Sequence, residues 1–123
     1  MKKTIMKISA LLILVAMMCI LCVACAPASK PENAKKALED AGYEVILNDK
    51  LLPDGIEAMI IAFKGDDDYI AITYYEDKDA LNEAWDEAKD GAKELEEEYK
   101  DIVCEKSGKM IYMGTKQAVK DAR

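Results

Sequence analysis

One long stretch with helical periodicity separates two pairs of short apolar segments in this chain, and this alternation limits the folds open to it. Between Asp77 and Tyr99, apolar residues recur every three or four positions, which predicts a helix with one apolar face. That face carries Leu81, Ala84, Trp85, Ala88, Ala92, Leu95 and Tyr99. The opposite face is mostly acidic, with several like charges one turn apart, so packing of the apolar face must stabilise this helix.

The segments on either side of this helix predict two β-hairpins and one additional strand. Gly65 begins the turn of the first hairpin, and Ser107-Gly108 forms the turn of the second. Pro53-Asp54-Gly55 is a further turn signal, because proline presets φ and glycine accepts positive φ. The predicted strands are 43–48, 56–64, 69–76, 102–106 and 109–113.

Two shorter helices are predicted at the ends of the domain. Ser29 and Glu32 have the spacing of a capping box, with Pro31 in the first turn, and Gly42 ends this first helix. A final short helix begins near Thr115. The element order α-β-β-β-α-β-β-α predicts an α+β fold, with an antiparallel sheet of about five strands packed with three helices. The order of the strands within the sheet stays open.

The first 30 residues have the composition of an export signal. Lys2, Lys3 and Lys7 form a positive start, and no charged residue follows from Ile8 to Ser29. This pattern is typical of a secretory signal peptide, so whatever follows residue 30 is expected outside the cytoplasm. Three fates are open for the segment: lipoprotein processing, cleavage after Ala28 by ordinary signal peptidase, or retention as an uncleaved anchor.

The end of the apolar run supports the first of these fates. The stretch Leu21-Cys22-Val23-Ala24-Cys25 resembles the signal of bacterial lipoproteins, although it has Cys22 where leucine is usual. The resemblance implies a diacylglycerol group on Cys25, cleavage before it, and an extracytoplasmic domain anchored to the cell membrane. The predicted organisation is a lipoprotein signal peptide at 1–24, a short tether at 25–30 and a single small α+β domain at 31–123.

The charge of the processed chain excludes some partners. Cleavage before Cys25 removes three of the 17 basic residues and none of the 24 acidic ones, which leaves a net charge of −10. Such a domain repels phosphate backbones, which argues against nucleic acid, and it repels anionic lipid headgroups. Cys104 is the last cysteine in the chain, so no internal disulfide is expected in the mature domain, and Cys104 is interpreted as a buried strand residue.

The residue types of the chain argue against catalysis. There is no histidine, which removes the usual general base and most zinc or copper sites. Asp66-Asp67-Asp68 is interpreted as a solvated hairpin tip, because the ligand spacing of a calcium-binding EF-hand is not met. We therefore predict no enzyme activity, no cofactor and no metal. A hydrolase that uses two carboxylates about 5–10 Å apart stays formally open.

The strand at 56–64 carries the main indication of a binding surface. It is apolar on both sides, with Met59, Ile61 and Phe63 on one face and Ile56, Ala58, Ile60 and Ala62 on the other. A strand of this kind is normally covered on both faces, and three helices are few for that. The hypothesis is that one sheet face, rich in tyrosine and methionine, is incompletely covered and binds a partner. The alternative is a sealed sandwich, in which the first and last helices cover that face.

The predicted function is that of a membrane-anchored extracytoplasmic lipoprotein, acting as a non-catalytic accessory or protein-interaction module for an envelope or membrane protein. The candidate binding residues are Tyr74, Tyr75, Met110 and Tyr112. A homodimer is a further option. The alternative function is binding of a small molecule or solute in a pocket of about 300 Å³ or more, lined by Tyr74, Tyr75 or Tyr112.

Overall fold

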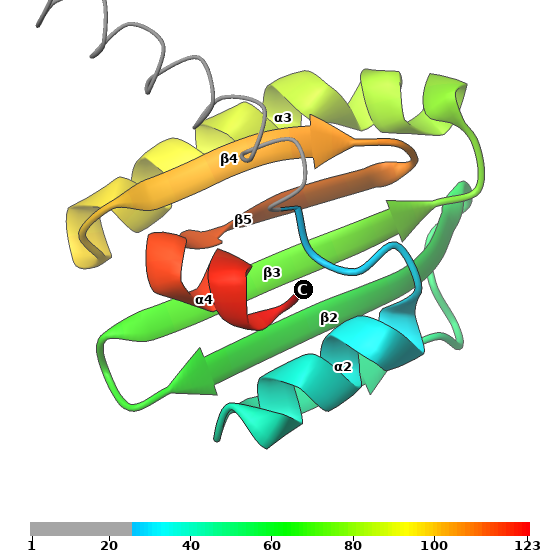
Figure 1. Cartoon of the computed structure of the whole chain (residues 1–123). Coiled ribbons are helices and arrows are strands. Elements are labelled where there is room, and N and C mark those ends of the chain that lie inside the picture. The colour runs from blue at the N-terminus through cyan, green and yellow to red at the C-terminus, as the bar shows by residue number, and fades with distance from the viewer. Residues whose placement is uncertain (1–25) are drawn as a thin grey trace, which may run out of the picture.

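The computed structural model describes residues 26–123, and these residues have the α-β-β-β-α-β-β-α order that the sequence predicts (Figure 1). The described part contains three helices and one five-stranded sheet in which all neighbouring strands are antiparallel. The elements are α2 (Pro31–Asp40), β1 (Glu44–Asn48), β2 (Ile56–Lys64), β3 (Asp68–Tyr75), α3 (Lys78–Glu98), β4 (Ile102–Ser107), β5 (Met110–Thr115) and α4 (Lys116–Asp121).

The strands lie in the order β1-β2-β3-β5-β4, so β1 and β4 are the two edges. A bulge interrupts the pairing of β2 with β3, where the register shifts between Ile56 and Ala58. The extra residue, Glu57, turns Ile56 to the face that it shares with Tyr75. The prediction that Ile56 lies on the same face as Ala58 was therefore wrong, because a bulge reverses the alternation of side chains at one point.

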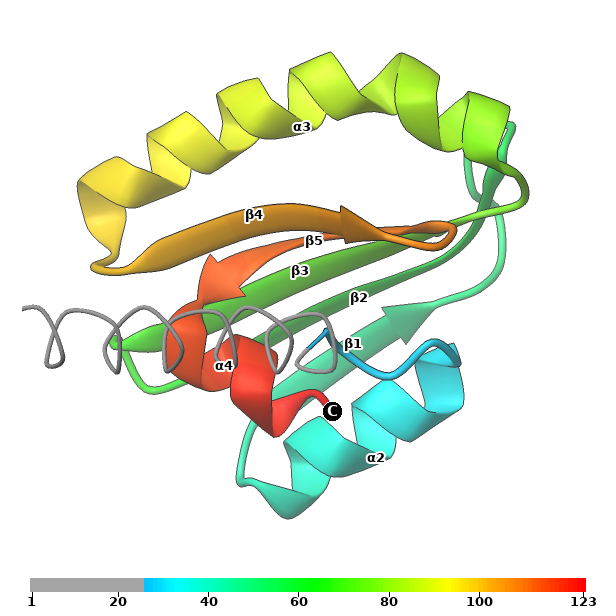
Figure 2. The same ribbon diagram turned by 45° about the horizontal axis from the view of Figure 1, so that its top comes forward.

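The helices cover the sheet from both sides, as Figure 2 shows: α3 lies over one face, and α2 and α4 lie against the other. The larger core fills the space under α2 and α4, where Leu38, Ile60, Ile70 and Ile72 are fully buried. A smaller core under α3 contains Tyr75, Leu81 and Ile111, with Trp85 packed beside them. Helices on both faces explain why β3 is apolar on both sides.

Three of the predicted helix ends are confirmed. The Asp77 carboxylate accepts a hydrogen bond of 2.8 Å from the backbone N–H of Ala80, and the Thr115 hydroxyl accepts one from Ala118. Gly42 has a φ of +93° and follows α2 in the hydrogen-bonding pattern of a Schellman motif.

The capping box at the start of α2 is a wrong prediction. The residue that precedes the helix is Lys30, and no side chain caps it. Pro31 occupies the first helical position, where its missing N–H is tolerated. The helix therefore starts one residue too late for Ser29 and Glu32 to bond each other's backbone.

The closest approach of neighbouring backbone to a glycine occurs within the sheet and not under the long helix. Gly91 lies in the middle of α3, but a Cβ there would meet no atom within 4 Å. At Gly114 in β5, a Cβ would lie 2.8 Å from the Cα of Ile70 and would also meet the backbone oxygen of Tyr69. The tight contact is thus between two strands of the sheet.

Residues 26–30, predicted as a tether, pack on the domain. The backbone N–H of Ala28 donates a 2.9 Å hydrogen bond to the carbonyl of Ala122, just after α4. The hydroxyl of Tyr74 donates to the carbonyl of Ala28 at 2.8 Å, and Ala26 and Ala28 contact the larger core. The chain therefore enters the domain on the face that α2 and α4 cover.

Two tyrosine hydroxyls link distant parts of the chain, and their ionisation should lower the stability of the domain at alkaline pH. Tyr43 donates a 2.9 Å hydrogen bond to Asp121, and Tyr74 donates to Ala28. Burial raises the pKa of both phenols above their usual value of about 10. Asp121 adds to the rise in the pKa of Tyr43, and the charge of Glu32 adds to that of Tyr74.

A phenol pKa that is higher in the folded state gives stability that is fully present below pH of about 10 and is lost as the pH rises above it. We expect Tyr74→Phe to cost about 0.5–1.5 kcal/mol at pH 8, because one hydrogen bond is lost. The Tyr43→Phe, Tyr74→Phe double variant should also lose less stability between pH 9 and 11 than the wild type. Urea unfolding across this range measures both effects. Parallel pH profiles for the two proteins would contradict this prediction.

Candidate functional site

The helix α3 leaves part of its own sheet face uncovered. It packs against β4, β5 and β3 and contacts Ile56 at the start of β2. Among residues 26–123, no helix covers the rest of this face on β1 and β2 (Figure 2). Three large apolar side chains are exposed there: Ile46 at 59%, and Ile61 and Phe63 at 36% each. Met59, which neighbours Ile61 along the same face of β2, is half-buried. We call the surface formed by Ile46, Met59, Ile61 and Phe63 the open strip.

The strand register makes the open strip continuous. Ile46 of β1 lies directly opposite Ile61 of β2, which in turn lies opposite Ala71 of β3. Tyr69 of β3 borders the open strip on the side toward α3. It lies opposite Phe63, and its ring stacks on that of Tyr99, with ring centroids 5.6 Å apart. Contiguous apolar surface with polar margins often marks an interaction site on a soluble domain.

The edge of β1 adds unpaired backbone groups to this surface. The strand has the sequence Glu-Val-Ile-Leu-Asn, and its pairing with β2 runs without a bulge. It thus contains no proline, lysine or bulge, the devices with which proteins commonly block a sheet edge. Its short length of five residues and the charge of Glu44 at its start are the protective features that the strand has.

The four predicted binding residues lie in the cores. Met110, Tyr74 and Tyr112 are buried under α2 and α4, and Tyr75 is buried under α3; all four are 4–7% exposed. The hypothesis that the face rich in tyrosine and methionine is incompletely covered was therefore wrong, because α2 and α4, the first and last helices of the domain, cover the face with Tyr74, Met110 and Tyr112. The incompletely covered face is the opposite one, which carries the open strip. Sequence reasoning placed Ile61 and Phe63 on a common face without choosing them, and it missed Ile46.

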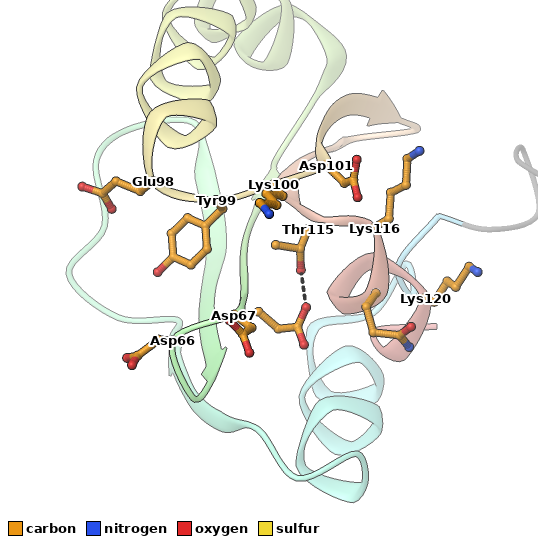
Figure 3. A pocket seen from close by; sticks show the side chains of 11 residues that line it. Asp66, Asp67, Glu98, Tyr99, Lys100, Asp101, Thr115, Lys116 and Lys120 are labelled. Carbon is orange, nitrogen blue, oxygen red and sulfur yellow. Dashed lines mark hydrogen bonds between the residues drawn. The ribbon is translucent and has the colours of Figure 1, made fainter.

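A separate pocket of about 510 Å³ lies at the end of the sheet where α3 ends and α4 begins (Figure 3). Its volume exceeds the one expected for solute binding, but Tyr74, Tyr75 and Tyr112 do not line it. The lining residues come from the β2–β3 turn, the α3–β4 connection and the start of α4: Asp66, Asp67, Asp68, Glu98, Tyr99, Lys100, Asp101, Thr115, Lys116, Gln117 and Lys120.

The pocket combines charges of both signs. The Thr115 hydroxyl donates a 2.9 Å hydrogen bond to Asp68, as drawn in Figure 3. The ammonium groups of Lys116 and Lys120 extend away from the side where Asp66 and Asp67 lie. Within residues 26–123, no group of three or more His, Cys, Asp or Glu side chains is placed to hold a metal ion.

Cys104 is the one cysteine among the described residues. Cys104 is a free thiol on β4, half-buried beneath α3, with its Sγ 4.0 Å from the carbonyl of Ala88. Burial raises the pKa of this thiol, and the charge of Glu105 adds to the rise, so little reactive thiolate forms at neutral pH. Cys25 and the predicted signal peptide at 1–24 lie outside the described residues. In the part of the chain that is described, no helix has the length and apolar character needed to cross a membrane.

Comparison of the chain with protein-family models, with curated proteins and with solved structures gives no match.

Proposed function

We propose that this chain is a lipoprotein anchored through Cys25 to the outer face of a bacterial cell membrane, and that its domain is a non-catalytic accessory module. In this proposal the domain contacts another envelope protein through the open strip. The similarity of residues 21–25 to a lipoprotein signal supports the anchor. The single observation that carries the contact is the exposure of Ile46, Ile61 and Phe63 side by side.

The size of the open strip suits a contact that depends on the anchor. Full burial of one large apolar side chain contributes roughly 1.5–3 kcal/mol, and these three side chains are already partly covered. The contact alone is therefore modest. Attachment to the same membrane raises the effective concentration of two partners and strengthens a modest contact without additional interactions.

The path of the chain near Ala28 would set the orientation of the anchored domain relative to the membrane. Ala28 is held on the face covered by α2 and α4, and the open strip lies on the opposite face. A lipid on Cys25 would hold the α2 and α4 face near the bilayer. The open strip would then point away from the membrane, toward the extracytoplasmic part of a neighbouring protein.

Phe63→Glu tests the contact, because it places a charge in the open strip at a position that is already partly exposed. We expect the full-length chain, cross-linked in native membranes and purified, to enrich a specific envelope protein, and Phe63→Glu to reduce that enrichment at least tenfold. Leu51→Glu is the matched control, since Leu51 is fully exposed in the β1–β2 loop. Cys25→Ala should move the protein out of the membrane fraction and reduce enrichment as well.

Two results would contradict the proposal. Equal enrichment with wild type and Phe63→Glu would remove the open strip as the contact. Fatty-acid labelling that persists in Cys25→Ala would remove the anchor.

The pocket favours solute binding as a second candidate function. Its volume of about 510 Å³ suits a small molecule, and its lysine and carboxylate side chains suit a ligand that carries both charges. Phe63 is not among its lining residues. Phe63→Glu should therefore leave solute binding unchanged, which distinguishes the two candidates.

A further inference from the structure

The exposed edge strand β1 is complementary to itself. When two copies of Glu44–Asn48 are aligned antiparallel about Ile46, each Ile46 lies opposite Ile46 of the partner subunit. Glu44 then lies opposite Asn48 of the partner subunit, and Val45 lies opposite Leu47 of the partner subunit. Apolar residues meet apolar ones, and no two carboxylates face each other.

The neighbouring registers are poorer. A pairing centred on Val45 places Glu44 opposite Ile46 of the partner subunit, and one centred on Leu47 places Ile46 opposite Asn48 of the partner subunit. Both also pair fewer residues of the strand. The sequence of β1 thus favours a single register with all five residues paired.

We propose that two copies of this chain associate through their β1 strands and form one continuous antiparallel sheet. Since each copy contributes five strands, the joined sheet has ten. The pairing satisfies the open backbone groups of both edges and places the two Ile46 side chains in contact on the face of the open strip. The association goes beyond the proposed function, and it rests on the proposed anchor only for the orientation of the two copies.

The position of the chain start distinguishes this arrangement from other dimers. Antiparallel pairing of identical edges has a two-fold axis perpendicular to the sheet, so the same face of each copy points the same way. Ala28 of both copies would then lie on one side of the dimer, and both lipid anchors would reach one membrane. A dimer formed by laying one open strip on the other would direct the anchors to opposite sides.

Edge pairing also enlarges the surface of the proposed contact. The two open strips would join into one apolar floor across β2 and β1 of both copies. With strands about 4.8 Å apart, this floor is roughly 19 Å wide. The two α3 helices would lie on either side of it, because each packs over the strands beyond β2. The dimer would then offer twice the apolar surface of one copy.

Disulfide trapping in membranes that contain the full-length chain tests the register. Opposite residues of an antiparallel pair have Cα atoms about 4.5–5.5 Å apart, within the range of about 4.4–6.8 Å that a disulfide spans. We expect Ile46→Cys to give a covalent dimer after mild oxidation. Ile61→Cys should not, because three strand spacings, roughly 14 Å, would separate the two copies of that residue. Lys106→Cys on the other edge strand should also give no covalent dimer, and neither should the wild type.

A charge at the centre of the pairing provides a second measurement. We expect the detergent-solubilised full-length chain to have the mass of a dimer, and Ile46→Lys to have that of a monomer, since two ammonium groups would face each other. Leu51→Lys, which adds the same charge in the adjacent loop, should stay dimeric. The dimer fraction of the wild type should rise with salt, because each processed copy carries a net charge of −10.

Each contrary outcome has a definite meaning. A lack of cross-linking at Ile46→Cys overturns the proposal. Cross-linking at Ile61→Cys points to open strips laid face to face, and cross-linking at Lys106→Cys points to the β4 edge; either result also overturns it. Failure of the proposed function is separate, because Phe63→Glu can abolish capture of an envelope protein while Ile46→Cys still cross-links.

Discussion

Replacing Gly114 with alanine should destabilise the domain by about 3 kcal/mol, the upper part of the range for overpacking a well-packed interior. The added Cβ would lie 2.8 Å from the Cα and 2.9 Å from the Cβ of Ile70, so β3 and β5 would have to move apart. Neither strand is free to move, because β2 holds β3 on one side and β4 holds β5 on the other. Urea unfolding of the full-length chain, followed by circular dichroism, measures the loss.

Gly91→Ala is the matched control for that variant. It makes the same chemical change in the middle of α3, where the new Cβ meets nothing within 4 Å. Alanine is a better helix former than glycine, so this variant should gain roughly 0.5–1 kcal/mol. Opposite signs for the two variants are expected. A loss at Gly91→Ala as large as that at Gly114→Ala would show that α3 packs more tightly than described.

Replacing Ile72 with alanine should cost about 2–5 kcal/mol, the range for truncating a large buried apolar side chain. Ile72 is fully buried in the central strand β3, where it lies opposite Ile60 of β2 and Tyr112 of β5 under α2 and α4. Removal of its outer carbons leaves a cavity that neighbours on three sides prevent from collapsing. The midpoint of urea unfolding reports the change.

Ile61→Ala, one strand away on the other face, should cost about 1 kcal/mol or less, because water already reaches this side chain and no closed cavity forms. The pair of variants therefore measures how open the strip is in solution. Equal costs at Ile61 and Ile72 would mean that the open strip is covered, and the proposed contact surface would then not exist.

Periodicity in the sequence predicted most of the fold because each element in this chain has a clear apolar pattern. The seven apolar positions from Leu81 to Tyr99 predicted the helix α3, which begins directly after Asp77. Adjacent residues of a strand point to opposite faces, and Tyr74 and Tyr75 accordingly lie in the two different cores. Strand order was out of reach, since hairpin turns fix which strands are neighbours within a hairpin but not that β5, and not β4, lies beside β3.

The surface for binding was predicted less well than the fold. Tyrosine and methionine were favoured because they are common in interfaces, but Tyr74, Met110 and Tyr112 are covered by two helices packed on one face. A helix about 10–12 Å wide covers roughly two strands spaced about 4.8 Å apart. One helix is therefore too narrow for a sheet of five strands, and α3, which packs against β3, β5 and β4, leaves β1 and β2 open. That conclusion requires knowing the side on which each helix packs, which periodicity does not contain.

The hydrogen bond between Ala28 and Ala122 has a practical consequence for work on this protein. It brings the two ends of the folded domain together, so a reporter or affinity tag fused after Arg123 would begin close to Ala28 and therefore near the proposed lipid attachment point. It also means that a short linker from Arg123 back to Ala26 would close the chain, with new ends opened in the loop that contains Leu51. If the proposed lipidation signal preceded the new N-terminus, that loop would lie nearest the membrane and the sheet would have a different orientation.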